Sequence, residues 1–446
     1  MLMPSLKVNK RETRKEFSAK YGSYLAAKTS KGTYGISVYL HCLASGHVAK
    51  KLLGPRFLSQ GVRSWIEKEY PGVLEYLPFV IACHDVGKIC AGFQAMIRKV
   101  PGLSPPPYDD TFGCLRHEVI SYEATKGFLG EALAKILLYH HGSYRNGEYY
   151  PDHGQLLEGV GWAIAREATI KALAKAFNVD VLSIPKKISL PQSLWKYLAG
   201  LVVVSDWVAS DESCFPADLN GYTAKDIPEL AHKALMRYGF QLPMNSSIPD
   251  LSFQELFGFT PNPGQEVMAR EIDGPGLYIY EAPMGIGKTE AALYPALDLY
   301  RKGVVDGVYF GMPTQVTSNR ILQRMDEAIQ RWFDDPSTKL LHGTADVFHN
   351  PSEDDWFRGN KRAVLDEFGA GTIDQALLGV LPNVKHFFIR TMGMCRKAVI
   401  IDEVHSYDMY TSGLVKSLID EIVEMDGVVI VLTATLTDEA KRRLLL

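Results

Sequence analysis

The residues best suited to chemistry begin with the pair His84-Asp85, which follows the apolar stretch 77–83 and precedes Val86-Gly87-Lys88. Adjacent residues on a regular helix point about 100° apart. The two side chains can therefore serve one metal cluster only if each faces a different ion or edge. An isolated His-Asp pair is more often a solvated helix end. Further candidate metal ligands occur in the same half of the chain, namely His41, His117, His140, His141 and Asp206.

The seven groups are imidazoles and carboxylates, with no thiolate among them. Such a donor set suits Mn, Fe, Co, Ni or Mg better than structural zinc, and this number of donors indicates two ions. Two closely spaced ions turn a bridging water into hydroxide and neutralise the oxygens of an in-line phosphoryl displacement. The set therefore predicts a nuclease or phosphatase centre. Lys88 is a candidate catalytic residue that would add positive charge beside the scissile phosphate; the alternative is a solvated helix end.

Other histidines and the overall composition restrict which residues could bind metal and which partners the protein could have. His47 shares the predicted helix of His41 and His153 lies in a polar segment, so neither is expected to bind metal. The net charge of -3 confines nucleic-acid binding to local patches. Six cysteines without a C-x-x-C pair suit reduced thiols. Since no apolar run is long enough to span a bilayer, we expect a soluble cytoplasmic protein.

The C-terminal half carries a second group of motifs. Residues 282–289, Ala-Pro-Met-Gly-Ile-Gly-Lys-Thr, follow a β-rich run and open a helical stretch, which is the context of a phosphate-binding loop. Gly285 and Gly287 let backbone N–H groups approach the phosphates of ATP. Lys288 would reach the β and γ phosphates, and the Thr289 hydroxyl would coordinate Mg²⁺.

The other half of this nucleotide site is predicted at the buried run 398–401, which leads into Asp402-Glu403. Asp402 would hold Mg²⁺, and Glu403 would orient and deprotonate the attacking water. Gln265, upstream, would read adenine. Further motifs follow in the order expected for a motor ATPase: Pro313-Thr314 with Thr317 and Asn319, Gly371-Thr372-Ile373-Asp374-Gln375, and Thr433-Ala434-Thr435.

The spacing of apolar residues predicts the elements that position these groups. From about residue 38 to 238 the apolar residues recur at helical spacing, which predicts an all-α half. Beyond residue 245, the β-rich runs 276–281, 307–312, 398–401 and 428–432 alternate with helical stretches. This alternation predicts an α/β domain with a parallel sheet, whose ligands collect at the carboxyl ends of the strands.

The N-terminal order H, H-D, H, H-H, D resembles the HD superfamily, and most closely the nuclease domain of the CRISPR-associated nuclease-helicase of type I interference. His41-Cys42-Leu43 with Val48-Ala49 looks like that family's first-ligand helix, although Ala44 stands where the family commonly has Asp. The resemblance favours His41 over His47 and implies attack on single-stranded DNA. It implies that two ions of Mn, Ni, Co or Fe are bound by His41, His84, Asp85, His117, His140, His141 and Asp206.

The C-terminal motifs resemble those of superfamily 2 helicases, and Asp402-Glu403-Val404-His405 with Ser406-Tyr407-Asp408 resembles the CRISPR-associated subfamily. The resemblance implies that the Pro313 and Gly371 segments touch the DNA backbone, and that the Thr433 segment links ATP hydrolysis to strand movement. It also implies a guide-RNA surveillance complex as partner. We expect a basic tail over residues 1–25, an HD domain over 26–245 with a linker from about 215, and a first RecA-like lobe over 246–446.

Two other functions fit parts of the pattern. One is an HD nucleotide phosphohydrolase with a regulatory NTP-binding domain, which the DNA-contact motifs at Pro313 and Gly371 disfavour. The other is a non-catalytic adaptor whose half-motor docks onto a partner complex. The intact set of seven candidate ligands disfavours the adaptor, because a degenerate enzyme is expected to lose some of them.

The sequence shows the motifs of one RecA-like lobe, so we expect a longer chain or a separate polypeptide to supply a second. That lobe normally contributes arginines that stabilise the γ-phosphate and raise turnover by about 10³-fold or more. We therefore predict that this chain alone has only feeble DNA-stimulated ATPase activity, measured as phosphate release with and without single-stranded DNA. Robust turnover without an added chain would contradict this prediction.

Overall fold

The computed structural model describes residues 25–31, 33–55, 57–98, 116–141, 160–218, 221–238, 249–313, 315–332, 365, 367–382, 384, 387–404, 407–437 and 441–442. The chain forms two compact units. Unit 1 comprises Met1–Phe57, Tyr70–Leu190 and Leu201–Phe240, and unit 2 comprises Leu58–Glu69, Pro191–Gly200 and Gln241–Leu446. Two short segments of the N-terminal half therefore belong to the same compact unit as the C-terminal half.

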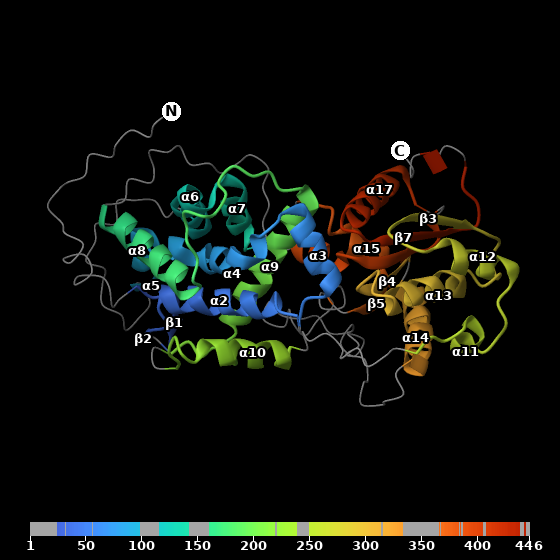
Figure 1. Cartoon of the computed structure of the whole chain (residues 1–446), viewed down its shortest axis with the longest axis horizontal. Helices are drawn as coiled ribbons and strands as arrows, with labels where there is room; N and C mark the ends of the chain where they lie inside the picture. Colours follow the sequence, from blue (N-terminus) through green and yellow to red (C-terminus); the bar gives the residue numbers. More distant parts are fainter. Residues whose placement is uncertain are drawn as a thin grey trace. The chain divides into compact units, whose positions relative to one another are not determined.

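Unit 1 is helical, as the sequence predicts (Figure 1). The short strands β1 (Thr29–Ser30) and β2 (Thr33–Tyr34) pair antiparallel. They differ from the all-α structure that the sequence predicts for this half. A helix, α10, occupies part of the segment expected to be linker. The helical elements are α2 (Val38–Leu52), α4 (Val73–Ala82), η1 (Cys83–Lys88), α5 (Ala91–Arg98), α6 (His117–Leu129), α7 (Glu131–Ile136), η2 (Leu137–Tyr139), α8 (Val160–Ala176), α10 (Ile227–Arg237) and the part of α9 (Gln192–Ser210) from Leu201 onward.

Helices α2 and α4 pack on each other in the core of unit 1. The hydroxyl of Ser37 caps α2 by accepting a hydrogen bond from the Leu40 N–H at 3.3 Å, which satisfies a donor that the first turn leaves free. α4 is buried from Tyr76 to its last residue, as expected for a helix that is apolar all round. Because α4 ends inside the unit, the residues that follow it on η1 begin in the interior.

Gly87 permits close packing of η1 on α6. A Cβ atom at this position would lie 1.9 Å from the His117 carbonyl oxygen and 2.6 Å from the Ser121 nitrogen. The Gly87 N–H also donates to the Ser121 hydroxyl at 2.8 Å. The absence of a side chain at Gly87 thus brings the backbones of η1 and α6 together.

Unit 2 is built on a five-stranded parallel sheet with the order β3-β7-β6-β4-β5, which confirms the predicted α/β class. Four of its strands fall on the predicted β-rich runs. β5 was predicted only as a motif segment, because its sequence Phe-Gly-Ala-Gly-Thr lacks a run of large apolar residues. The strands are β3 (Gly276–Glu281), β4 (Gly307–Met312), β5 (Phe368–Thr372), β6 (Lys397–Ile401) and β7 (Val428–Thr433).

Helices cover both faces of this sheet (Figure 1). On one face, α13 (Lys288–Arg301) and α14 (Gln315–Trp332) contact the strands, and a core forms around buried residues such as Phe310, Ile400 and Ile430. On the other face lie α15 (Ile373–Leu377) and α17 (Met409–Glu424). Unit 2 also contains α3 (Gln60–Glu69), α11 (Phe253–Phe257), α12 (Pro263–Glu271) and α16 (Phe387–Met394). Within the described residues, no helix combines the length and apolar character that crossing a bilayer requires.

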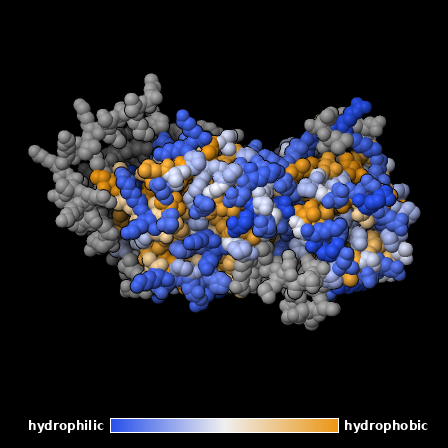
Figure 2. All heavy atoms as spheres, viewed as in Figure 1, coloured by the Kyte–Doolittle hydropathy of each residue, from blue (hydrophilic) through white to orange (hydrophobic). Residues whose placement is uncertain are grey.

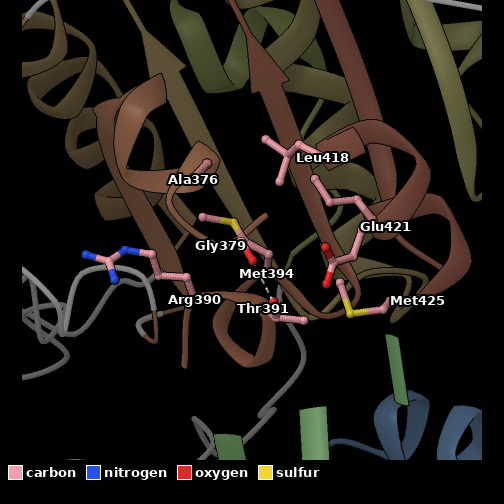
Figure 3. Close-up of a pocket in the computed structure, with 9 residues that line it drawn as sticks. Ala376, Gly379, Arg390, Thr391, Met394, Leu418, Glu421 and Met425 are labelled. Atoms are coloured by element: carbon pink, nitrogen blue, oxygen red, sulfur yellow. Dashed lines mark hydrogen bonds between the residues drawn. The ribbon is translucent and has the colours of Figure 1, made fainter. Parts of the chain in front are cut away.

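A buried ion pair and a small pocket lie near α17 within unit 2. Lys196 donates to a Glu421 carboxylate oxygen at 2.8 Å, and both side chains are buried. Burial raises the pKa of Glu421, and Lys196 opposes this change. Figure 3 shows that Glu421 also lines the pocket, with Ala376, Leu418 and Met425 among the apolar residues beside it. None of the predicted nucleotide-binding residues lines this pocket.

We predict that Gly87→Ala destabilises the protein, because the added methyl group would overlap the backbone of α6. Overpacking of this kind costs roughly 1–3 kcal/mol, and calorimetry should show a lower unfolding temperature. Gly127→Ala is the matched control, since no atom lies within 4 Å of its added Cβ. That exposed helical substitution should stabilise by about 0.5–1 kcal/mol. Equal unfolding temperatures for the two variants would contradict the packing argument.

Candidate metal centre and nucleotide site

The seven predicted ligands come from separate helical segments of unit 1 and converge in two groups. They are His41 near the start of α2, His84 and Asp85 on η1, His117 at the first position of α6, His140 and His141 directly after η2, and Asp206 near the end of α9. One group contains His41, His84, Asp85 and Asp206, and the other contains His117, His140 and His141. Within each group, the candidate ligand atoms lie within 4.8 Å of one another.

Asp85 lies between the two groups and faces both. Its Oδ2 is 3.0 Å from His41 Nε2 and 3.4 Å from His84 Nε2. Its Oδ1 is 3.2 Å from His117 Nε2 and 3.4 Å from His140 Nε2. A carboxylate whose two oxygens point to different sets of imidazoles could contribute to holding an ion in each group. Both residues of the His84-Asp85 pair thus reach the centre.

Two histidines are held in the tautomer that metal binding requires. His84 Nδ1 lies 3.0 Å from the Ile81 carbonyl oxygen, and His140 Nδ1 lies 2.8 Å from the Leu137 carbonyl oxygen. A carbonyl only accepts, so each Nδ1 carries the hydrogen and each Nε2 turns a lone pair toward the centre. Both Nε2 atoms and His41 Nε2 are buried without a hydrogen-bond partner among the described residues. Buried polar atoms in folded proteins normally have partners. Bound divalent cations would supply partners for these nitrogen atoms.

The electrostatics of the cluster also favour positive charge. Burial lowers the pKa of His84, but the carboxylates of Asp85 and Asp206 outweigh it and raise this pKa to about 10. Burial acts to raise the pKa values of Asp85 and Asp206, yet neighbouring cationic and hydrogen-bonding groups hold both well below the usual range. At His141, burial and the neighbouring His140 and His117 lower the pKa to about 2. The two buried carboxylates thus favour positive charge at the centre, held as a proton on His84 unless a metal ion replaces it.

Lys88 belongs to this cluster, whereas the nearby His47 does not. The Lys88 ammonium lies 2.5 Å from Asp85 Oδ2, and its side chain is only 15% exposed. The lysine is therefore not a solvated helix end. Burial acts to lower its pKa, but Asp85 dominates and raises it. His47 instead packs on the Phe177 ring at 5.1 Å, and His153 lies outside the described residues.

Three residues near the centre carry no motif signal. The Ser210 hydroxyl donates to Asp206 Oδ1 at 3.1 Å, and the Ser210 carbonyl accepts from the Lys28 ammonium. Gln94 is fully buried and donates to the Lys88 carbonyl oxygen at 2.9 Å. Their importance depends on tertiary contacts, so residue type and spacing gave no means of finding them.

The phosphate loop of unit 2 lies between β3 and α13. Gly285 and Gly287 have φ angles of 78° and 83°, which only glycine adopts without strain. α13 begins at Lys288, so its free N–H groups open toward the loop. The Lys288 ammonium donates to the Ala282 carbonyl oxygen at 3.0 Å and is therefore folded back over the loop. This cradle fits the phosphates of a nucleotide, with Thr289 on the next position of the helix.

Gln265 supports this loop from α12. Its Nε2 donates to the Gly287 carbonyl oxygen at 3.1 Å, and its Oε1 accepts from the Asn262 N–H at 2.9 Å. The Asn262 amide donates in turn to the Ile286 carbonyl oxygen at 2.9 Å. The Gln265 amide is thus engaged with the protein backbone, and its contact with adenine stays a prediction.

The strand order brings the remaining catalytic candidates to the same edge of the sheet. β7 separates β3 from β6, and Thr433 at its end pairs with Glu281 beside the phosphate loop. Asp402 follows β6, and its Oδ1 accepts from the Glu403 N–H at 2.8 Å. Glu403 has a φ of 54°, an uncommon backbone conformation for a non-glycine residue that often marks active sites.

The predicted DNA-contact segments also end at this edge, as far as they are described. Pro313 follows β4, and Gly371 and Thr372 on β5 pair with Gly311 and Met312 on β4. Thr435 is exposed beyond β7. Thr314, His405, Ser406 and the side chains of Thr317 and Asn319 lie outside the described residues.

Comparison with known proteins matches a family model to each half of the chain. Residues 26–215 match the family model described as Cas3, HD domain, and residues 262–443 match that described as DEAD/DEAH box helicase. Over most of its length the chain is similar to Cas3 proteins. The CRISPR-associated endonuclease/helicase Cas3 of Thermus thermophilus is 32% identical over 460 residues, which cover 91% of this chain and 49% of that protein. Cas3 of Escherichia coli K12 is 37% identical over 207 residues, which cover 42% of this chain and 23% of that protein.

Solved Cas3 structures share the fold. The crystal structure of T. fusca Cas3 with AMPPNP has a TM-score of 0.76 and 25% identity, and the match covers 95% of this chain and 51% of that one. A second CRISPR-associated protein gives a TM-score of 0.79 and 27% identity, with coverages of 94% and 52%. The chain spans about half the length of these structures and of the T. thermophilus Cas3.

We predict that divalent metal stabilises the chelator-treated protein against heat, because only the folded state assembles the seven donors. At a free metal concentration of about 100 times Kd, the gain is about 2.7 kcal/mol per site. Calorimetric titration with Mn²⁺, Ni²⁺ or Co²⁺ should resolve binding at two sites. The double variant His84→Ala, Asp85→Ala should lose both effects, whereas His47→Ala, the matched control, should keep them. Equal metal binding by the double variant would contradict this ligand set.

Proposed function

We propose that this chain is the metal-dependent nuclease and first motor lobe of a CRISPR type I interference enzyme that degrades single-stranded DNA. The observation that carries the proposal is the position of Asp85, a buried carboxylate with histidine nitrogens on both oxygens and a lysine beside it. This arrangement suits hydrolysis of a phosphodiester better than a structural metal site, which is usually closed and often thiolate-rich.

The residues of unit 1 have complementary roles in this chemistry. When bound, two divalent ions of Mn, Ni, Co or Fe would supply a hydroxide from a bridging water and neutralise the phosphate oxygens. Asp85 sets the spacing between the two groups. The backbone carbonyls of Ile81 and Leu137 keep His84 and His140 oriented. Lys88 offers a positive charge beside Asp85 that would stabilise the developing charge on the scissile phosphate.

The residues of unit 2 would bind and hydrolyse ATP. Backbone N–H groups around Gly285 and Gly287, with Lys288, would hold the phosphates, and Thr289 and Asp402 would hold the accompanying Mg²⁺. Glu403 would accept the proton of the attacking water. These groups make up the nucleotide site of one RecA-like lobe.

The relatives support the choice of substrate and partner. Proteins similar over most of this chain are named CRISPR-associated endonuclease/helicase Cas3, and a chain of a CRISPR RNA-guided surveillance complex in a pre-nicking state has a TM-score of 0.69 and 25% identity. That match covers 94% of this chain and 48% of that one. We therefore expect a guide-RNA surveillance complex to recruit the protein to a displaced DNA strand.

We predict that the purified chain cuts circular single-stranded DNA when Mn²⁺, Ni²⁺ or Co²⁺ is added, and leaves it intact in chelator. The double variant His84→Ala, Asp85→Ala should lose the cutting, because it removes ligands from both groups. His47→Ala should cut like the wild type. Gel analysis of the circles distinguishes an endonuclease, since an exonuclease has no end at which to start.

Free deoxynucleoside triphosphates tested in parallel separate the competing functions. Their hydrolysis by a protein that leaves DNA intact under every metal would favour a nucleotide phosphohydrolase. Activity on neither substrate, with metal bound, would favour a non-catalytic adaptor.

A further inference from the structure

A second lysine lies close to the proposed metal centre. Lys28 immediately precedes β1, and its ammonium donates a hydrogen bond to the Ser210 carbonyl oxygen at 3.1 Å. The Ser210 hydroxyl donates to Oδ1 of Asp206, a predicted ligand, at 3.1 Å. Ser210 therefore connects the Lys28 ammonium with the ligand set. The charges of Asp206 and Lys88 both act on the Lys28 ammonium.

The backbone on either side of Lys28 is fixed to the same centre. Gln94 is fully buried, and its Nε2 donates to the carbonyl oxygens of Ala26 at 3.0 Å and Lys88 at 2.9 Å. Its Oε1 accepts from the Ala26 N–H at 3.3 Å. Across the hairpin, the Gly35 N–H donates to the Lys28 carbonyl oxygen at 2.9 Å. One buried amide thus ties the chain two residues before Lys28 to the backbone of Lys88, so both lysines are placed together.

Among the described residues, the carboxylate that pairs with the Lys28 ammonium is distant and exposed. Its side chain is 24% exposed, and the Glu212 carboxylate lies 3.9 Å away on a side chain that is 64% exposed. An exposed pair at this distance contributes little. Burial lowers the pKa of Lys28 and Lys88 adds to this change, whereas the carboxylates of Glu212, Asp206 and Asp211 oppose it. A partly desolvated cation with a distant counter-ion is stabilised when an anion reaches it.

We propose that Lys28 is a second phosphate-binding lysine of the nuclease centre, and that it holds a phosphate of the single-stranded DNA next to the scissile one. The inference rests on the proposed nuclease function. Lys88 is already paired with Asp85 at the centre, whereas Lys28 lies beyond Asp206 and retains N–H donors for a second anion. Two cations at different distances from the ligands fit a chain of regularly spaced phosphates.

A purely structural role for Lys28 makes a different prediction. The Ser210 carbonyl belongs to the last residue of α9, and a cation near a helix C-terminus stabilises the helix. A capping role affects the unfolding temperature but neither DNA affinity nor its salt dependence. Lys28→Met keeps the aliphatic stem and removes the charge, and Lys28→Arg keeps the charge. Lys233→Met on α10 is the matched control, because that lysine is 69% exposed and pairs with Glu229 on its own helix.

The test uses the whole chain and a short fluorescent single-stranded oligonucleotide. Affinity is measured by anisotropy in chelator over a series of salt concentrations, and KM and kcat for cutting are then measured with Mn²⁺. For Lys28→Met we expect several-fold weaker binding and a salt slope of log K that is smaller by about 0.7, the value for one lost phosphate contact on a single strand. KM should rise more than kcat falls. Lys28→Arg should restore most of the affinity, and Lys233→Met should match the wild type.

Each outcome separates the two proposals. If Lys28→Met binds with wild-type affinity and salt slope and cuts with wild-type KM, the Lys28 proposal is overturned while the nuclease proposal stands. A lower unfolding temperature in that variant would then identify the lysine as a helix cap. Failure of the wild-type protein to bind the oligonucleotide overturns both proposals. A wild-type protein that binds but does not cut fails the nuclease proposal, and with it the role of Lys28 at a scissile phosphate.

Discussion

A buried carboxylate must be neutralised, and in unit 1 this requirement centres on Asp85. Its two oxygens face imidazole nitrogens from α2, η1, α6 and the turn after η2, and the Lys88 ammonium adds a positive charge. An isolated carboxylate at this depth would be very costly. The segments that supply the surrounding groups must therefore pack closely on η1. The side-chain-free Gly87 permits the approach of α6, and the buried α4 delivers η1 into the interior.

In unit 2 the corresponding constraint is the geometry of a parallel sheet. All five strands run the same way, so the groups that follow β3, β4, β6 and β7 collect at one edge. There the backbone adopts conformations that regular structure avoids, with positive φ at Gly285, Gly287 and Glu403. Backbone strain at functional sites persists only where the surroundings hold it, and the buried strands β6 and β7 provide such support.

Both sites are also supported by a buried glutamine that joins backbones from different elements. Gln94 connects Ala26 with Lys88 beside the metal centre, and Gln265 connects Asn262 with Gly287 at the phosphate loop. An amide side chain suits this role because it donates and accepts at once and carries no charge that burial would penalise. Each glutamine thereby fixes the backbone next to groups that would contact phosphate.

The kind of site in each half could be predicted from residue types and their order alone. Phosphate loops and HD clusters need particular residue types at particular local positions, so Lys288, Asp402 and the His84-Asp85 pair were evident from composition and order. Apolar periodicity likewise predicted the helical half and four of the five strands, but not the glycine-containing β5. The three-dimensional packing was needed to see how the seven candidate ligands divide into two groups and that Lys88 faces Asp85. It was needed likewise to see that Gln265 holds the phosphate loop and that Ser210 connects Lys28 with Asp206. These relations join residues far apart in the chain, and they arise from packing and from the neutralisation of buried charge, which local sequence does not encode.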